Sequence, residues 1–445
     1  MSELLLLGIS HKTAPVRLRE RLALAEPAVP GFLHAVAAEP GVEEAVVLST
    51  CNRTELVLVV DDPVAAEAAV LGRLARGAGI RPTQLAGIVY AARNCDAARQ
   101  LFRVTAGLES MIVGEAEVQG QVRRAYETAL AAGTTGPLTN RLYTAALQAG
   151  KRARSETRLG AGHASLSSVA VALAEEILGD LRRRDVLVVG AGESSELTAR
   201  ALHERGVRTL FVANRRVDRA RALAERFGGA VIAFDELPAR LEQADIVVSS
   251  TASSQPIVGQ EELDVVMRAR GRRPLMLVDL AVPRDVDPAC GTLEGVALYD
   301  IDDLQAVVDR TLDGRGAEAL RAETIVEDEI GRFADWLGTL ASRPTVAALR
   351  AHGTGIVEQV LAENAGRWES ASPRDLARMD AIARAVMNRL LHEPTIRLRA
   401  VGQEGHHGRL EVVRELFGLH GHEPEAPEQD QGAEVRPLAP RRTGS

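Results

Sequence analysis

The sequence predicts a multidomain α/β protein, and three observations lead to that class. Short apolar runs alternate with helical patterns over residues 1–60, which is typical of an α+β domain. From Asp185 onward a strand, a glycine-rich turn, a helix and a second strand follow one another, which is the order of a parallel βαβ unit. After about residue 305 the apolar residues have helical spacing only. We therefore expect an α+β domain, a parallel-sheet domain and a helical domain, in that order.

The composition is that of an ordinary folded protein, and it argues against several kinds of partner. The chain has 445 residues, 46% of them hydrophobic, which is enough for several domains with sizeable cores. Aromatic content of 3% and a net charge of −8 argue against DNA as a partner, although a local basic face can still hold a structured RNA. The chain shows no apolar run of about 18 residues and no signal peptide, so we expect a cytoplasmic protein without a membrane partner.

The elements of the first domain follow from apolar runs and their spacing. Strands are expected over residues 4–10, 46–48 and 56–60, and residues 14–24, APVRLRERLAL, have the pattern of an amphipathic helix. Residues 95–160 are helical in pattern, with glycine interruptions, and end in the basic segment KRARSETRLG.

Cys51 lies in a polar turn between two of these strands, in the segment STCNRTE. A cysteine kept for packing is expected within an apolar run, and the charge of Arg53 would favour the thiolate, the nucleophilic form. From these residues alone Cys51 is either a nucleophile or an incidental thiol. Cys95 and Cys290 are distant in sequence and form no CxxC pair. This spacing predicts a reducing compartment and no zinc site built on cysteine, and no motif in the chain requires a metal.

The second domain begins with the features of a dinucleotide site. The apolar residues 186–189 lead directly into Gly190, Ala191 and Gly192, a turn that can bring backbone N–H groups to a pyrophosphate at a helix N-terminus. Ser195 replaces the third glycine of the usual fingerprint, so a glycine turn without a ligand is the alternative.

The end of the next strand indicates which dinucleotide binds. An NAD site normally has an acidic residue there, whereas this chain has Asn214, Arg215 and Arg216. Two cations at that point favour the 2′-phosphate of NADP, with solvated surface arginines as the alternative. We therefore predict a Rossmann-like NADP-binding domain.

The C-terminal region is helical and ends in a polar tail. Apolar residues at 326, 330, 333, 337 and 340 form a seam for a partner helix or a core-facing stripe. A second amphipathic helix over residues 376–394 is expected to stop at Pro394. Residues 421–445 are rich in Pro, Glu, Gln and Gly, which predicts a disordered tail.

A nucleophilic thiol and NADPH together indicate one chemistry. The thiol takes an activated acyl group as a thioester, and a hydride reduces that thioester to an aldehyde. In this chain the cysteine precedes the nucleotide fold, whereas in glyceraldehyde-phosphate dehydrogenases it follows that fold.

Several motifs in order resemble those of the glutamyl-tRNA reductase family. They are GISHKTAPVRLRERLAL, LSTCNRTEL, GLESMIVGEAEVQGQVRRAY, KRARSET, VVGAGE, ANRR, SSTAS and LVDLAVPRDVDP, and the resemblance runs from residue 4 to about residue 418. It implies NADPH-dependent reduction of glutamyl-tRNA(Glu) to glutamate-1-semialdehyde, the first step of the five-carbon route to 5-aminolevulinate and tetrapyrroles. It also implies a V-shaped homodimer with a long spinal helix, and it suggests the downstream glutamate-1-semialdehyde aminotransferase as a further partner.

The resemblance also implies domain limits. They are a catalytic, glutamyl-tRNA-recognising domain over residues 1–160, an NADPH-binding Rossmann-like domain over 161–310, and a helical dimerisation domain over 311–420, before the tail 421–445.

The resemblance assigns a role to each matching residue. Cys51 would be the nucleophile, and Arg53 would bind the side-chain carboxylate of the substrate, for which a planar guanidinium is suited. Gln100 stands where the family usually has a histidine considered to handle protons. The implied substrate contacts are Thr50, Cys51, Asn52, Arg53, Ser110, Glu115, Ala116, Glu117 and Gln121. The cofactor contacts are Gly190, Ala191, Gly192, Glu193, Ser194, Ser195, Asn214, Arg215 and Arg216.

Three departures from the family pattern leave alternatives open. Gln100 cannot carry a proton at neutral pH, Glu117 replaces a neutral glutamine, and Glu109 replaces an aspartate. These changes are either tolerated or the mark of a relative with weak activity or another acyl donor. A member that only binds charged tRNA, or a shikimate-dehydrogenase-like oxidoreductase, explains less of the chain. The sequence assigns no role to His11 and Lys12, and Arg152, Arg154 and Arg158 are either tRNA contacts or a solvated helix face.

Overall fold

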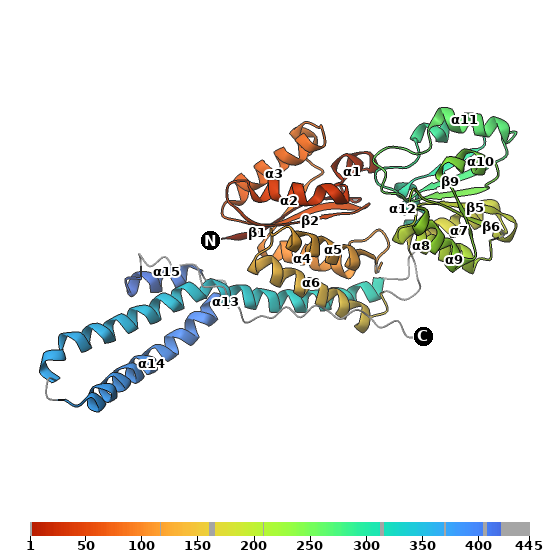
Figure 1. Cartoon of the computed structure of the whole chain (residues 1–445). Coiled ribbons are helices and arrows are strands. Elements are labelled where there is room, and N and C mark those ends of the chain that lie inside the picture. The colour runs from red at the N-terminus through yellow and green to blue at the C-terminus, as the bar shows by residue number, and fades with distance from the viewer. Residues whose placement is uncertain are drawn as a thin grey trace. The chain divides into compact units, whose positions relative to one another are not determined.

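The structure is a computed structural model that describes residues 2–115, 117–159, 165–207, 209–311, 316–368, 371–403 and 407–419. It forms two compact units, Met1–Ile330 and Gly331–Ser445. The first unit contains both sheets, and the second is helical (Figure 1). The predicted disordered tail, residues 421–445, lies outside the described residues.

The first sheet has four strands in the order β2-β3-β1-β4. Its central strands β1 (Glu3–Ser10) and β3 (Arg53–Val60) are antiparallel, and β2 (Val42–Ser49) and β4 (Tyr90–Arg93) form the edges. Every residue of β3 is buried, because helices cover both faces of the sheet. Figure 1 shows α3 on one face and α4, α5 and α6 on the other. The helices of this domain are α1 (Val16–Leu22), α2 (Val29–Ala37), α3 (Pro63–Gly77), α4 (Asn94–Ala106), α5 (Glu117–Ala131) and α6 (Pro137–Glu156).

The second sheet confirms the predicted Rossmann-like architecture. Its six strands are all parallel, in the order β10-β9-β8-β5-β6-β7. The strand order reverses between β5 and β8, which is where ligands bind in such sheets. The strands are β5 (Asp185–Val189), β6 (Thr209–Ala213), β7 (Ala230–Ile232), β8 (Ile246–Ser249), β9 (Leu275–Asp279) and β10 (Val296–Tyr299). The helices are α7 (Leu166–Leu178), α8 (Glu193–Glu204), α9 (Val217–Phe227), α10 (Leu237–Leu241), α11 (Gln260–Ala269) and α12 (Ile301–Thr311).

The predicted long helix is α13 (Gly316–Glu363), which has 48 residues and begins in the first unit. Its first part is held there by ion pairs of Arg99 with Glu327, at 2.8 Å, and of Arg152 with Glu329, at 2.7 Å. Val326 and Ile330 of the apolar seam are buried, as a core-facing stripe requires.

The second unit also contains α14 (Pro373–Gln403) and α15 (His407–Leu416). The prediction that the second amphipathic helix stops at Pro394 is wrong, because α14 continues through this residue. A proline removes one backbone hydrogen bond, but the turn after it carries Leu398, which is buried in a cluster with Leu349 and Leu410. That packing keeps the last turns helical. No helix in the described part of the chain has the length and hydropathy of a membrane span.

Candidate active site

Cys51 lies at the tip of the hairpin between β2 and β3, in a turn closed by hydrogen bonds. The backbone N–H of Thr50 donates to the Arg53 carbonyl at 2.8 Å, and the Thr50 hydroxyl accepts from the N–H groups of Asn52 and Arg53 at 3.1 and 3.2 Å. The N–H of His11 donates to the Asn52 carbonyl at 2.9 Å. The sequence favours a short turn here because the threonine hydroxyl can accept hydrogen bonds from backbone N–H groups two and three residues later.

Arg53 has a carboxylate partner within the chain. Its Nη1 lies 2.9 Å from Glu55 Oε1, and the two residues are 3% and 1% exposed. Its Nη2 donates to the carbonyl of Glu109. Because strand residues two apart share a face, Arg53 and Glu55 both point to the side of β3 on which Gln100 of α4 lies.

The charge of Arg53 is paired with Glu55, and the cation that acts to lower the pKa of Cys51 is Arg19. Burial raises the pKa of Cys51 to about 12, with Glu115 and Glu117 acting in the same direction and Arg19 opposing them. Cys51 is therefore a thiol near neutral pH, and transfer of an acyl group requires a proton acceptor.

Gln100 contacts Glu55. Its Nε2 donates to Glu55 Oε1 at 3.0 Å, and the hydroxyl of Tyr90 donates to the same oxygen. Burial, together with the Glu55 charge, raises the pKa of Tyr90, so it stays a donor. Glu55 Oε1 thus accepts from Arg53, Tyr90 and Gln100, and Gln100 supplies one of these three donors.

Four buried polar atoms in this region have no hydrogen-bond partner among the residues that the structure describes. They are His11 Nδ1, Asn52 Oδ1, Glu55 Oε2 and the Tyr143 hydroxyl. Burial, and then the charge of Arg53, lowers the pKa of His11 to about 3, so this imidazole is neutral. Buried polar atoms without partners are costly, and they are expected where a ligand or water completes the set.

The loop after α4 brings Ser110 and Glu109 to the site. Ser110 is buried, and Glu109 accepts hydrogen bonds from Lys12 and, at 2.9 Å, from Arg103. Burial acts to raise the pKa of Glu109, but Lys12 and Arg103 outweigh it and hold the pKa below its usual value. Gly114 has φ +88°, and a Cβ there would lie 2.2 Å from the Leu159 carbonyl, so the loop requires glycine.

Glu115 and Glu117 are acids with raised pKa values. Burial raises the pKa of Glu115 to about 7, with the charge of Arg53 opposing and that of Glu193 assisting. Burial, then Glu115 and Glu193, raise the pKa of Glu117 to about 8. Gln121 follows on α5 and is half-buried, and Ala116 lies outside the described residues.

The predicted cofactor turn lies at the carboxyl end of β5. Gly190 has φ +121°, and a Cβ there would lie 2.3 Å from the Ser250 carbonyl. Gly192 has open space where its Cβ would be, so its backbone can approach a ligand. Ser195, in place of the third glycine, is buried and points its hydroxyl to the Ser250 carbonyl at 3.4 Å. Glu193 and Ser194 open α8; Glu193 pairs with Arg124 of α5 at 3.0 Å.

A cavity of about 270 Å³ lies beside this turn at the switch point of the sheet. Its lining includes Ala191, Gly192, Asn214, Arg215, Arg219, Phe234 and the loop Ser250–Ser253 after β8. Arg216 is not among the lining residues and forms an ion pair with Asp218 at 3.1 Å. A glycine edge and two guanidinium groups on one cavity fit a dinucleotide with a 2′-phosphate.

Comparison with known proteins identifies the family. Residues 7–157 match the model "Glutamyl-tRNAGlu reductase, N-terminal domain", residues 172–307 the model "Shikimate / quinate 5-dehydrogenase", and residues 321–419 the model "Glutamyl-tRNAGlu reductase, dimerisation domain". The chain is 40% identical over 417 residues to the glutamyl-tRNA reductase of Syntrophotalea carbinolica, covering 94% of each chain. It is 43% identical over 415 residues to that of Rubrobacter xylanophilus, covering 93% of this chain and 96% of the relative. The chain belongs to the glutamyl-tRNA reductase family.

A solved structure supports this assignment. Glutamyl-tRNA reductase from Methanopyrus kandleri matches 94% of this chain and 99% of its own, with 33% identity and a TM-score of 0.51.

Sequence reasoning missed several residues of the site in this family member. Glu55 is the partner of Arg53, and Arg219, in the first turn of α9, lines the cofactor cavity together with Arg215. Asp285 orders the loop after β8, since its Oδ2 accepts from the Ser249 hydroxyl at 2.6 Å and from the Thr251 N–H at 2.8 Å. The one sequence signal for Glu55 is its position two residues after Arg53 in the same strand, which places both side chains on one face.

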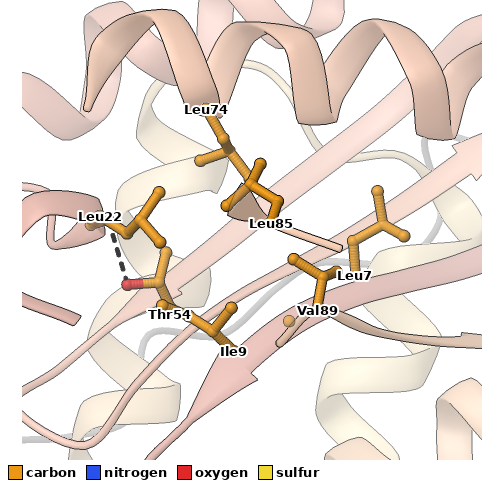
Figure 2. Close-up of a pocket in the computed structure, with 8 residues that line it drawn as sticks. Leu7, Ile9, Leu22, Thr54, Leu74, Leu85 and Val89 are labelled. Carbon is orange, nitrogen blue, oxygen red and sulfur yellow. Dashed lines mark hydrogen bonds between the residues drawn. The ribbon is translucent and has the colours of Figure 1, made fainter. Parts of the chain in front are cut away.

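A second cavity, in the N-terminal domain of this reductase family member, is apolar and about 10 Å³ (Figure 2). Figure 2 shows Leu74 and Leu85 facing Leu7 and Ile9 of β1, with the Thr54 hydroxyl bonded to the Leu22 carbonyl at 3.3 Å. Its volume admits at most about one water molecule, so it is a packing defect and no substrate site.

Proposed function

We propose that this protein reduces the glutamyl group of glutamyl-tRNA(Glu) to glutamate-1-semialdehyde with NADPH, the first step of the five-carbon route to 5-aminolevulinate and tetrapyrroles. One observation carries the proposal. Cys51 packs against the buried cluster that joins Met111 and Ile112 of the first domain to the core of the parallel sheet, including Val188 and Val278. A candidate nucleophile and a dinucleotide fold therefore meet in one compact unit.

The first step transfers the glutamyl group to Cys51. The sulfur attacks the ester carbonyl carbon, a C–S bond forms, and the C–O bond to the tRNA ribose breaks. The thiol proton ends on the departing ribose oxygen, so the step is balanced. Glu115 lies close enough to raise the pKa of Cys51, and its own pKa of about 7 lets it accept and return that proton.

The second step releases the aldehyde from Cys51. NADPH, when bound, supplies the hydride to the thioester carbon. The C–S bond breaks and the thiolate recovers a proton from Glu115 or solvent. Gly190 and Gly192 would hold the pyrophosphate, and Arg215 and Arg219 the 2′-phosphate.

The substrate glutamate would complete the buried polar groups that lack partners. Asn52 Oδ1 and Glu55 Oε2 are acceptors suited to its ammonium group, Thr50 belongs to the Cys51 turn itself, and Ser110 lies in the loop after α4. Arg53 would hold the side-chain carboxylate only by sharing its guanidinium with Glu55, since a fork of five N–H groups can serve two carboxylates. Glu117 and Gln121 of α5 would make further substrate contacts, as would Ala116, which lies outside the described residues.

The departure at Glu117 supports this function rather than another substrate. With a pKa of about 8, its carboxyl group is mostly protonated at neutral pH. A protonated carboxyl offers a donor and an acceptor, as the glutamine usual at this position does. Gln100, in turn, retains the donor that Glu55 requires.

The domain assignment follows from these roles. We assign catalysis to residues 1–160, NADPH binding to 161–310 and dimerisation to 311–420. A homodimer is supported by an apolar groove of about 460 Å³ between α13 and α14, beside which Ile382, Val386 and Leu390 are 63%, 52% and 70% exposed. Because the aldehyde product is reactive, direct transfer to the aminotransferase that consumes it is a further part of the proposal, as is a cytoplasmic location.

A single-turnover experiment tests the function. Glutamyl-tRNA labelled on the glutamate is mixed with wild type and Cys51→Ser, with and without NADPH. We expect label on the wild-type protein without NADPH, its release as semialdehyde when NADPH is added, and no adduct on Cys51→Ser. A wild type that binds charged tRNA but forms neither adduct nor aldehyde would refute the proposal.

A further inference from the structure

Arg19 of α1 is a buried cation that contacts both the turn of Cys51 and the cofactor domain. Only 2% of its surface is exposed, and its Nε donates to the Ala14 carbonyl at 3.1 Å. Its Nη1 donates to the carbonyl oxygen of Cys51 at 2.7 Å, and its Nη2 pairs with Asp302 Oδ1. One guanidinium therefore joins the nucleophile's own backbone to the first turn of α12.

Asp302 binds α1 a second time. Its Oδ2 accepts from the N–H of Val16 at 2.9 Å, so this carboxylate engages both the N-terminal N–H of α1 and the Arg19 side chain. Figure 1 shows α1 beside α12, the helix that follows β10. Two further ion pairs join the domains: Glu20 with Arg284 at 2.7 Å, and Arg124 with Glu193 at 3.0 Å. Among these three pairs in the described chain, Arg19 is the one whose cation also contacts the Cys51 turn.

Arg19 has no role in the proposed acyl transfer and does not line the cofactor cavity. Burying its charge nevertheless costs free energy. A buried guanidinium must find several acceptors, and here they come from three segments: the loop before α1, the Cys51 turn and α12. A planar group with five donors in fixed directions holds its acceptors in a fixed arrangement.

We propose that Arg19 is a positioning residue that, through Asp302, holds the Cys51 turn in place against the cofactor domain. The proposal rests on the proposed function and deepens it. A thioester on a correctly placed Cys51 is reduced before water reaches it. A thioester on a displaced turn is hydrolysed to glutamate, with the thiol released and no electrons transferred.

The test uses Asp302→Ala, since the side chain of Asp302 is 38% exposed and its loss leaves the buried Arg19 in place. The matched control is Asp303→Ala, the adjacent acid, whose carboxylate accepts from the Asp300 N–H within its own domain. Two quantities are measured: the rate of Cys51 alkylation by iodoacetamide without cofactor, followed by peptide mass spectrometry, and the ratio of semialdehyde to glutamate formed with saturating NADPH. Glutamate from spontaneous hydrolysis of the charged tRNA is measured without enzyme and subtracted, and the corrected product ratio then does not depend on the amount of folded enzyme.

We expect Asp302→Ala to raise the alkylation rate of Cys51 several-fold, because the Cys51 turn is no longer held against the cofactor domain. The ratio of semialdehyde to glutamate should fall about tenfold, because small displacements of reacting groups cost large factors in rate. Asp303→Ala should match wild type in both. If Asp302→Ala keeps the wild-type alkylation rate or the wild-type product ratio while forming thioester normally, the positioning role is wrong and the proposed function stands. A wild type that forms no thioester overturns both.

Discussion

Arg53 and Glu55 form an ion pair at 2.9 Å in which both residues are almost completely buried. Such a pair adds little net stability, but removing one partner leaves an uncompensated charge in a medium of low dielectric constant. We expect Arg53→Met or Glu55→Leu alone to lower the free energy of unfolding by about 3–5 kcal/mol. The double variant should cost less than the two single variants added together.

Urea denaturation of wild type, the two single variants and the double variant measures this coupling. The control is the pair of Arg73 and Glu39, which are 33% and 17% exposed, and for which the single variants should cost no more than about 1 kcal/mol. Additive effects at Arg53 and Glu55 would show that the two charges are not coupled.

Position 100 is predicted to require a hydrogen-bond donor to Glu55. Gln100→His keeps a donor and should retain activity within about threefold, whereas Gln100→Leu removes a hydrogen bond to a charged group and should cost about 2 kcal/mol of stability. Steady-state aldehyde formation and urea denaturation measure the two effects. An increase in activity of tenfold or more in Gln100→His would instead assign a proton-handling role to this position.

The raised pKa of Glu117, about 8, predicts how activity changes with pH. Below pH 8 the carboxyl is mostly neutral, and above it the carboxylate repels the substrate's own carboxylate. Glu117→Gln should therefore match wild type at pH 7 and exceed it in kcat/KM at pH 9, the ratio rising through pH 8. Glu127→Gln, on the exposed side of the same helix, is the control and should show a constant ratio.

The stability of Glu117→Gln relative to wild type should also increase with pH. A folded-state pKa raised above the usual 4.5 means that the folded protein holds a proton that the unfolded chain has lost. This contribution to stability is complete below pH 4.5 and is lost as the pH rises through 8. Glu117→Gln should thus gain stability relative to wild type between pH 5 and pH 9, and a constant difference would contradict the raised pKa.

The order of the domains and the cofactor turn could be predicted because their signals are local. An apolar strand that runs into Gly190 and Gly192 specifies a tight turn whatever the rest of the chain does. The role of Arg53 could not be predicted in the same way. Its charge is paired with Glu55, which also accepts from Tyr90 and Gln100; these three residues come from β3, β4 and α4 and meet only in the folded domain.

Helix ends show the same limit. Pro394 is a local stop signal, but the packing of Leu398 with Leu349 and Leu410 overrides it, and those partners lie on α13 and α15. Likewise, Arg215 and Arg216 are equivalent neighbours in sequence. Only the start of α9 decides that Arg215 lines the cavity, while Arg216 pairs with Asp218.

This difference between the arginines predicts cofactor preference. Arg215→Gln and Arg219→Gln should each weaken NADPH binding about tenfold, because each removes a charge-assisted hydrogen bond to the 2′-phosphate, and should leave NADH binding nearly unchanged. Arg216→Gln is the matched control. Fluorescence titration with both nucleotides measures the affinities. Equal losses for all three variants would indicate a general effect of surface charge.

The exposed apolar residues of α14 predict the oligomeric state. Leu390 is 70% exposed beside the groove between α13 and α14, and an exposed apolar surface of this kind marks an interaction site. Leu390→Asp would place a charge in the covered surface, so we expect the dimer to dissociate at micromolar concentration. Val265→Asp on α11 is the control, since Val265 is 63% exposed outside this groove, and it should stay dimeric. Analytical ultracentrifugation distinguishes the two species. A Leu390→Asp protein that remains dimeric would place the dimer interface elsewhere, and a monomeric wild type would remove the homodimer from the proposal.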